Sequence, residues 1–260
     1  MIFELAPWVV AWCAFAMACG GFIKGVLGIG TPLLTVPMMA LVLPVHHTIV
    51  MMAFPVVVAN VWQVYDAEKP VETVTRFWPA FVALVVGTWA GVKILSGTDE
   101  KTLLLLVGIL VIAFTILQGS PRKITIPARL EKPAGAVFCG TAGVVGGLSS
   151  LFGPMLILYL VSLSTLEKNR FVNTISFLYI GAVVPWVAML IFVGVMDRKL
   201  AILSALAVIP LVVGLAAGRA VRKHVEETVF YRLVLGVLIL SGISMMWRAW
   251  QYGANSAIGG

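Results

Sequence analysis

Two short groups of residues, one in each half of the chain, have the composition of an anion site. Each combines glycine, a hydroxyl residue and a following proline: Gly28, Gly30, Thr31 and Pro32, and Ser149, Ser150, Gly153 and Pro154. Proline is tolerated at the first position of a helix, so each group predicts a helix start. The N–H groups and positive dipole end of a helix start attract anions, and hydroxyls add donors. We therefore predict a small oxyanion as ligand; the alternative is that the glycines only allow close helix contact.

Four other polar residues in or beside apolar stretches are secondary candidates. Lys24 lies four residues before Gly28 and could neutralise an anion, or its ammonium group could extend to a membrane surface. Asn60 and Asn173 could contact the ligand or form hydrogen bonds between helices. His47 is the candidate for coupling transport to a proton, with a surface role as the alternative.

Residues suited to other chemistry are scattered. Cys13, Cys19 and Cys139 form no CxxC pair, so we predict no metal site and no cofactor. The sequence has no HExxH, no GxSxG and no paired carboxylates inside an apolar segment, which argues against an enzyme. A carboxylate relay for protons or sodium also has no obvious carrier, because the acidic residues all flank the apolar segments.

The composition of the chain predicts an all-α polytopic membrane protein. Of the 260 residues, 61% are hydrophobic and 11% are charged, against about 25% charged in ordinary soluble domains. The mean hydropathy is +1.06. The net charge of +7 fits the excess of Lys and Arg in cytoplasmic loops better than nucleic-acid binding.

About eight to ten hydrophobic segments, all expected to be helical, are separated by short polar turns. Their approximate bounds are 6–28, 32–43, 46–66, 77–96, 102–119, 134–150, 154–164, 169–195, 199–218 and 229–250. Segments 32–43 and 154–164 are too short to cross a core of about 30 Å, since twelve helical residues span about 18 Å. Each is expected to pair with the segment before it. The pair is either re-entrant, with its tip near mid-depth, or bent but fully crossing.

The two halves of the chain resemble each other. LVVGTWAG at 84–91 recurs as LVVGLAAG at 211–218, and LLVGILVI at 105–112 recurs as LVLGVLIL at 233–240. Matches in the same order argue for a duplication. Each repeat would hold one broken helix pair and three transmembrane helices.

We predict a first repeat at 1–119, a cytoplasmic linker at 120–133 and a second repeat at 134–260, together one transmembrane transport domain. Loop charges favour inverted repeats. If each broken pair enters and leaves on one side, Lys and Arg divide 12 to 5 between the two faces. If each pair forms a single broken span, the repeats are parallel and the division is 9 to 8. The first arrangement obeys the positive-inside rule and places both termini in the periplasm.

The glycine-rich stretches resemble those that begin each half in the sulfite exporter TauE/SafE family, also called TSUP transporters. They are GFIKGVLGIGTPLLTVP at 21–37 and GVVGGLSSLFGPMLILYL at 143–160, the second followed by KNRFVNTISF. The resemblance covers nearly the whole chain and implies a multi-pass carrier of sulfur-containing anions in the bacterial inner membrane. Lys24 and Thr31 depart from the family pattern, and both add donors near the first helix break.

These observations together predict a secondary transporter that exports sulfite or an organosulfonate by alternating access between inverted halves. A passive anion channel and a carrier of a non-sulfur organic anion are the alternatives. The predicted partners are the anion, a coupled proton or cation and the lipid bilayer, with no nucleic acid. A homodimer stays open, because Gly87 and Gly91 could contact a helix of the same chain or of a second copy.

Overall fold

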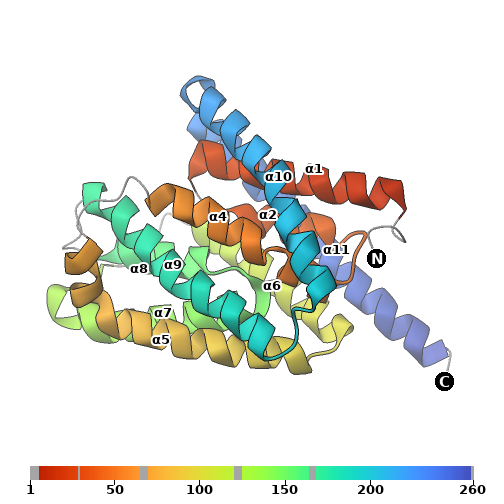
Figure 1. Ribbon diagram of the computed structural model, residues 1–260, viewed down its shortest axis with the longest axis horizontal. Helices are drawn as coiled ribbons and strands as arrows, with labels where there is room; N and C mark the ends of the chain where they lie inside the picture. Colours follow the sequence, from red (N-terminus) through yellow and green to blue (C-terminus); the bar gives the residue numbers. More distant parts are fainter. Residues whose placement is uncertain (1–5, 29, 65–69, 120–124, 164–167, 259–260) are drawn as a thin grey trace. The chain divides into compact units, whose positions relative to one another are not determined.

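The computed structural model describes residues 6–28, 30–64, 70–119, 125–163 and 168–258 (Figure 1). The protein is 88% helical. The helices are α1 (Pro7–Leu27), α2 (Thr31–Met39), α3 (Val45–Met51), α4 (Ala53–Val64), α5 (Pro70–Gly97), α6 (Glu100–Gly119), α7 (Glu131–Ser149), α8 (Gly153–Ser162), α9 (Lys168–Phe192), α10 (Arg198–Val221) and α11 (Glu227–Ile258). In the described parts, α1, α5, α6, α9, α10 and α11 are long and apolar enough to cross a membrane. The predicted all-α polytopic membrane protein is thereby confirmed.

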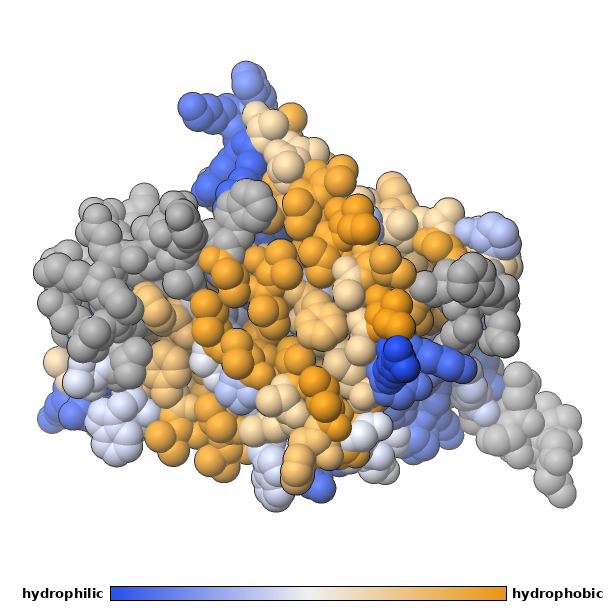
Figure 2. Space-filling view, in the orientation of Figure 1, coloured by the Kyte–Doolittle hydropathy of each residue, from blue (hydrophilic) through white to orange (hydrophobic). Residues whose placement is uncertain are grey.

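Large apolar side chains face outward on many of these helices. Phe192 is 88% exposed, and Trp8, Leu233 and Leu240 are also exposed. Figure 2 shows apolar residues, in orange, over much of the coloured surface on one face. Water would oppose such a surface, whereas the hydrocarbon core of a bilayer suits it.

The predicted break in the first glycine-rich stretch is confirmed. α1 ends at Leu27, and the turn to α2 contains Gly28 and Gly30, whose φ values are +80° and +99°. L side chains rarely adopt this left-handed region, so glycine suits both positions. α2 has only nine residues, about 14 Å of helix.

α2 folds back along α1. The indole Nε1 of Trp12 donates a hydrogen bond to the carbonyl oxygen of Met38, at 2.8 Å. The hydroxyl of Thr35 donates to the carbonyl of Ala16, at 3.4 Å. Residues far apart in sequence therefore lie at the same level of an antiparallel pair. A single broken span, as the parallel repeat requires, does not fit these contacts.

The prediction of one helix over segment 46–66 is wrong, because the helix is interrupted at Met52, between α3 and α4. Pro55 has no N–H, and its ring opposes a helix that continues through the preceding turn. The buried Ser204 of α10 bridges the break. Its hydroxyl donates to the carbonyl oxygen of Met51 and accepts the N–H of Phe54, both at 3.0 Å.

The chain forms two compact units. The first unit comprises Met1–Pro55, Gly97–Ser120 and Arg198–Gly260, and the second comprises Val56–Ser96 and Pro121–Asp197. Each unit contains helices from both predicted repeats. The repeat boundaries themselves stay a prediction.

In the first unit α10 packs across α1 (Figure 1), and glycines lie at the contact. A Cβ atom on Gly21 or Gly25 of α1 would collide with the backbone of α10. A Cβ atom on Gly214 or Gly218 of α10 would collide with the backbone of α1. The two helices touch backbone to backbone, so close helix contact is the correct interpretation for these glycines.

The second unit repeats this contact between α5 and α7. Gly87 and Gly91 of α5 face Gly143 and Gly147 of α7, and a Cβ atom on any of them would collide with the opposite backbone. In both units a helix of one predicted repeat contacts a helix of the other. Because Gly87 and Gly91 are engaged within the chain, they provide no dimer contact.

The matching helices α6 and α11 run antiparallel in the first unit. A Cβ atom on Gly108 of α6 would lie 3.0 Å from the carbonyl oxygen of Gly242 on α11. Further along, the hydroxyl of Tyr231 donates to the carbonyl of Gln118, at 3.4 Å. Residue numbers therefore increase along α6 in the direction in which they decrease along α11, as in an antiparallel helix pair. Matching helices of an inverted repeat run in opposite directions, as these two do; the inverted repeat itself stays a prediction.

Candidate functional site

The start of α2 provides the main elements of a site in the first unit. Gly30 is the N-cap residue and Thr31 opens the helix. Thr31 is 2% exposed, and its hydroxyl oxygen has no hydrogen-bond partner among the described residues. Burying a hydroxyl without a partner costs about 1–3 kcal/mol. A buried orphan hydroxyl at the positive end of a helix therefore indicates a place for a ligand.

The last turn of α1, directly before the turn to α2, contains a buried cationic residue. Lys24, in the last turn of α1, is 6% exposed. Arg219 of α10 lies close enough to repel it electrostatically. The pair of cations raises the local positive potential that an anion would meet.

The tip of the α1–α2 pair, here the turn containing Gly28 and Gly30, lies beside the ends of two crossing helices. Gly30 lines a cavity of about 20 Å³ together with Gln118 of α6 and Tyr231 of α11. Gln118 is the last residue of the candidate span Glu100–Gln118. The depth of this tip in a membrane stays a prediction. α1, with 21 residues and about 32 Å, is long enough to cross, whereas the nine residues of α2 are not.

The tip of the α7–α8 pair in the second unit is closed by its own side chains. The hydroxyl of Ser149 donates to the carbonyl of Val145, and that of Ser150 donates to the carbonyl of Ser149. Ser150 has φ of +65°, an uncommon value for a residue other than glycine. Both hydroxyl hydrogens are engaged, which ranks these serines below Thr31 as donors to an anion.

Aromatic rings fill the space around this second tip. Phe152 is fully buried and meets Trp186 edge to face, with ring centroids 5.8 Å apart. The indole of Trp186 donates to the carbonyl of Gly147, at 3.1 Å. A Cβ atom on Gly153 would collide with the hydroxyl of Tyr179, so Gly153 permits a close approach.

The structure describes two of the other secondary candidates, Asn60 and His47, each within its own unit. Asn60 is buried in the second unit, where its amide donates to the carbonyl of Val56 in its own helix, at 2.7 Å. The side chain of Asn173 lies outside the described part of the structure. His47 is half-buried on α3, which adjoins the opposite end of α6. The rise from Glu100 to Gln118 is about 27 Å, so His47 does not join the tip.

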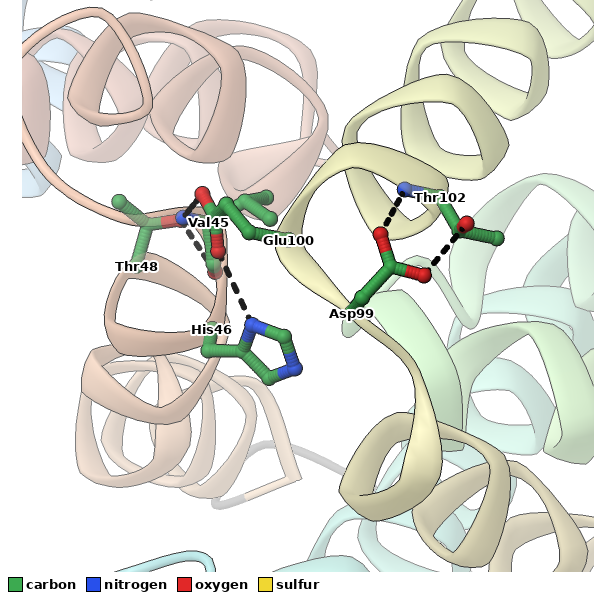
Figure 3. A network of polar contacts seen from close by, with 6 residues as sticks. All are labelled: Val45, His46, Thr48, Asp99, Glu100 and Thr102. Atoms are coloured by element: carbon green, nitrogen blue, oxygen red, sulfur yellow. Dashed lines mark hydrogen bonds and ion pairs between the residues drawn. The ribbon is translucent and has the colours of Figure 1, made fainter. Parts of the chain in front are cut away.

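His46, not His47, contacts an acidic residue (Figure 3). Its Nδ1 lies 3.0 Å from a carboxylate oxygen of Glu100, whose other oxygen accepts the N–H of Val45. The carboxylate thus ties the start of α3 to the start of α6. Beside it, Asp99 accepts two hydrogen bonds from Thr102, and these hydrogen bonds lower the pKa of Asp99.

An ion pair in the second unit was not predicted. The guanidinium group of Arg76, on α5, donates hydrogen bonds to both carboxylate oxygens of Glu131 at the start of α7. The distance from Nη2 to Oε2 is 2.7 Å. Tyr159 donates to the carbonyl of Glu131, at 3.0 Å. The guanidinium of Arg76 also lies 5.1 Å from the centre of the Phe77 ring. The partners are 55 residues apart, so no local pattern reveals the pair.

The structure thus brings Lys24, Gly28, Gly30 and Thr31 together in the first unit and adds Gln118 and Tyr231, which the sequence analysis missed. In the second unit it gathers Ser149, Ser150 and Gly153 around a filled tip. Within the described residues, no group of three or more His, Cys, Asp or Glu could hold a metal ion.

The fold defines a polytopic α-helical membrane protein in which two apolar helix pairs are broken by glycine, serine and proline. The family model described as sulfite exporter TauE/SafE matches residues 13–245. The chain belongs to this family of membrane transporters. No curated protein and no solved structure matches the chain.

Proposed function

We propose that the protein is a secondary transporter that exports a small sulfur-containing anion, sulfite or an organosulfonate, across the bacterial inner membrane by alternating access. Membership of a transporter family supports transport. The single observation that supports an anionic substrate is the orphan hydroxyl of Thr31 at the start of α2; Lys24 is buried in the last turn of the preceding helix. A buried donor, a cation and a helix start all attract negative charge.

Each tip is proposed as a binding element on its own. In the first unit the element consists of Gly28, Gly30 and Thr31, with Lys24 as the cation. In the second unit it comprises Ser149, Ser150 and Gly153, with Asn60 and Asn173 as further candidates. Since the two serine hydroxyls already donate to backbone carbonyls, we expect the first element to dominate binding.

Coupling to a proton is part of the proposal. His47 was the candidate from the sequence, but His46 has the better surroundings, because it contacts the carboxylate of Glu100. A carboxylate beside an imidazole favours its protonated form. The periplasmic position of both termini belongs to the proposal as well.

Transport into proteoliposomes tests this function. We expect the wild type to take up labelled sulfite, and Thr31→Val, which keeps the shape but removes the donor, to raise the KM about tenfold or more. Ser150→Ala is the matched control at the other tip, with a smaller expected effect. Uptake of no anion by the wild type, or unchanged uptake by Thr31→Val, would overturn the transport role or the site, respectively.

A passive channel would use the same tips and need no coupling ion. Counterflow separates the two mechanisms, because a carrier accelerates labelled exchange when substrate is present on the far side. We expect such acceleration. A flux that is independent of substrate on the far side would favour the channel.

A further inference from the structure

Two polar side chains meet beside the start of α2. The hydroxyl of Tyr231 lies 3.4 Å from both the backbone and the side-chain oxygen of Gln118. The side-chain nitrogen of Gln118 is buried and has no hydrogen-bond partner among the described residues. The orphan hydroxyl of Thr31 belongs to the residue that follows Gly30, and Gly30 lines the same cavity as Gln118.

The cavity that these residues share with Gly30 is very small. Its volume is about 20 Å³, and apart from Gly30, Gln118 and Tyr231 its lining is leucine, isoleucine and valine. A space of about 10–15 Å³ or more in this measure holds one water molecule. The cavity therefore admits a single oxygen atom, bound either in water or in a larger group whose remaining atoms lie outside.

The chemistry of the lining selects the kind of oxygen. The side-chain nitrogen of Gln118 only donates hydrogen bonds, whereas the hydroxyl of Tyr231 already donates to Gln118 and so positions that side chain. An oxyanion oxygen accepts hydrogen bonds and is bound strongly by such donors. Since the other lining atoms are apolar, an oxygen in the cavity would meet few competing partners.

We propose that Gln118, positioned by Tyr231, completes the anion site at the start of α2 by donating a hydrogen bond to one oxygen of a three-oxygen head group, such as a sulfonate. This inference rests on the proposed function and assigns the part of the site that selects the head group. With one oxygen in the cavity, two remain for Thr31 and the helix start. A carboxylate has only two oxygens in all and leaves one of these positions unfilled.

The test compares methanesulfonate and acetate, which share a methyl group and differ in the head group. Uptake of both is measured for the wild type, Gln118→Leu and Tyr231→Phe in proteoliposomes. We expect each substitution to raise the KM for methanesulfonate about tenfold to a hundredfold and the KM for acetate less than twofold. Tyr252→Phe, on the exposed surface of the same helix, is the matched control and should change neither.

Each outcome decides the inference. Two outcomes would contradict the inference and leave the transport function intact. Either the substitutions raise the KM equally for both substrates, or the wild type carries methanesulfonate and the substitutions leave its KM unchanged. A wild type that carries no sulfur oxyanion, sulfite included, contradicts the proposed function instead. If Gln118→Leu fails to fold, Gln118→Glu keeps the size and reverses the electrostatics. Normal methanesulfonate uptake by Gln118→Glu would also overturn the inference.

Discussion

The two units share a helix contact but differ in what fills the space beside it. Counting from the matching glycines, Gly135 of α7 corresponds to Cys13 of α1, and Ala80 of α5 corresponds to Ala207 of α10. In the second unit, a Cβ atom on Gly135 would lie 2.6 Å from the hydroxyl of Tyr159 and 3.3 Å from Ala80. In the first unit, Cys13 and Ala207 instead line an apolar cavity of about 210 Å³.

The tips of the two helix pairs also differ in how far side chains fill the space around them. Phe152 fills the tip of the second unit, and the hydroxyls there donate to nearby carbonyls. The tip of the first unit keeps the orphan hydroxyl of Thr31 and a water-sized cavity. The backbone contacts are thus common to both units, while side chains close one and leave the other open. This difference points to the first unit as the one with room for a ligand.

The largest effect is expected where the shared helix contact is broken. A leucine at Gly91 would drive its Cβ atom into the backbone of α7 at Val144, and backbone cannot move aside cheaply. We expect Gly91→Leu to cost at least about 3 kcal/mol and to abolish monodisperse protein in size-exclusion chromatography. Gly236→Leu, on an open face of α11 with nothing near its Cβ position, is the control and should fold normally. A stable Gly91→Leu would disprove the contact.

Removing the ion pair of the second unit comes next. Glu131→Gln removes the carboxylate charge that Arg76 contacts in a half-buried place, since 31% of the Arg76 side chain and 12% of that of Glu131 are exposed. Breaking a buried pair costs about 3–5 kcal/mol, and partial exposure lowers the expected loss to about 2 kcal/mol. Glu100→Gln, which removes the more exposed partner of His46 in the first unit, should cost less than half as much. Thermal and denaturant unfolding measure both, and equal losses would contradict the contrast.

Local sequence patterns predicted the features that depend on local chemistry. Apolar length defined the crossing helices, and the glycines and prolines located the break at Gly28 and Gly30. The segment 46–66 is not one continuous helix, and Ser204, about 150 residues away, forms hydrogen bonds with the backbone groups at the break. A single sequence contains no signal for that partner.

The candidate site was predictable only in part, for the same reason. The start of α2 follows from Gly30, Thr31 and Pro32, whereas Gln118 and Tyr231 join it through the antiparallel contact of α6 with α11. Polar residues at the ends of apolar segments were the available signal. The identity of the histidine beside Glu100 also needs the fold, since neighbours in a helix point about 100° apart.

The smallest expected effects come from one substitution made at matching positions in the two units. Ala207→Leu extends into the apolar cavity of the first unit and should stabilise the protein by about 1 kcal/mol. Ala80→Leu would crowd Gly135 beside Tyr159 in the filled second unit and should destabilise it by about 1–2 kcal/mol. Ala205→Leu, exposed on α10, is the control for hydrophobicity and should be near neutral. Thermal unfolding of the three variants measures the signs, and destabilisation by Ala207→Leu would show that the cavity is not open to a leucine side chain.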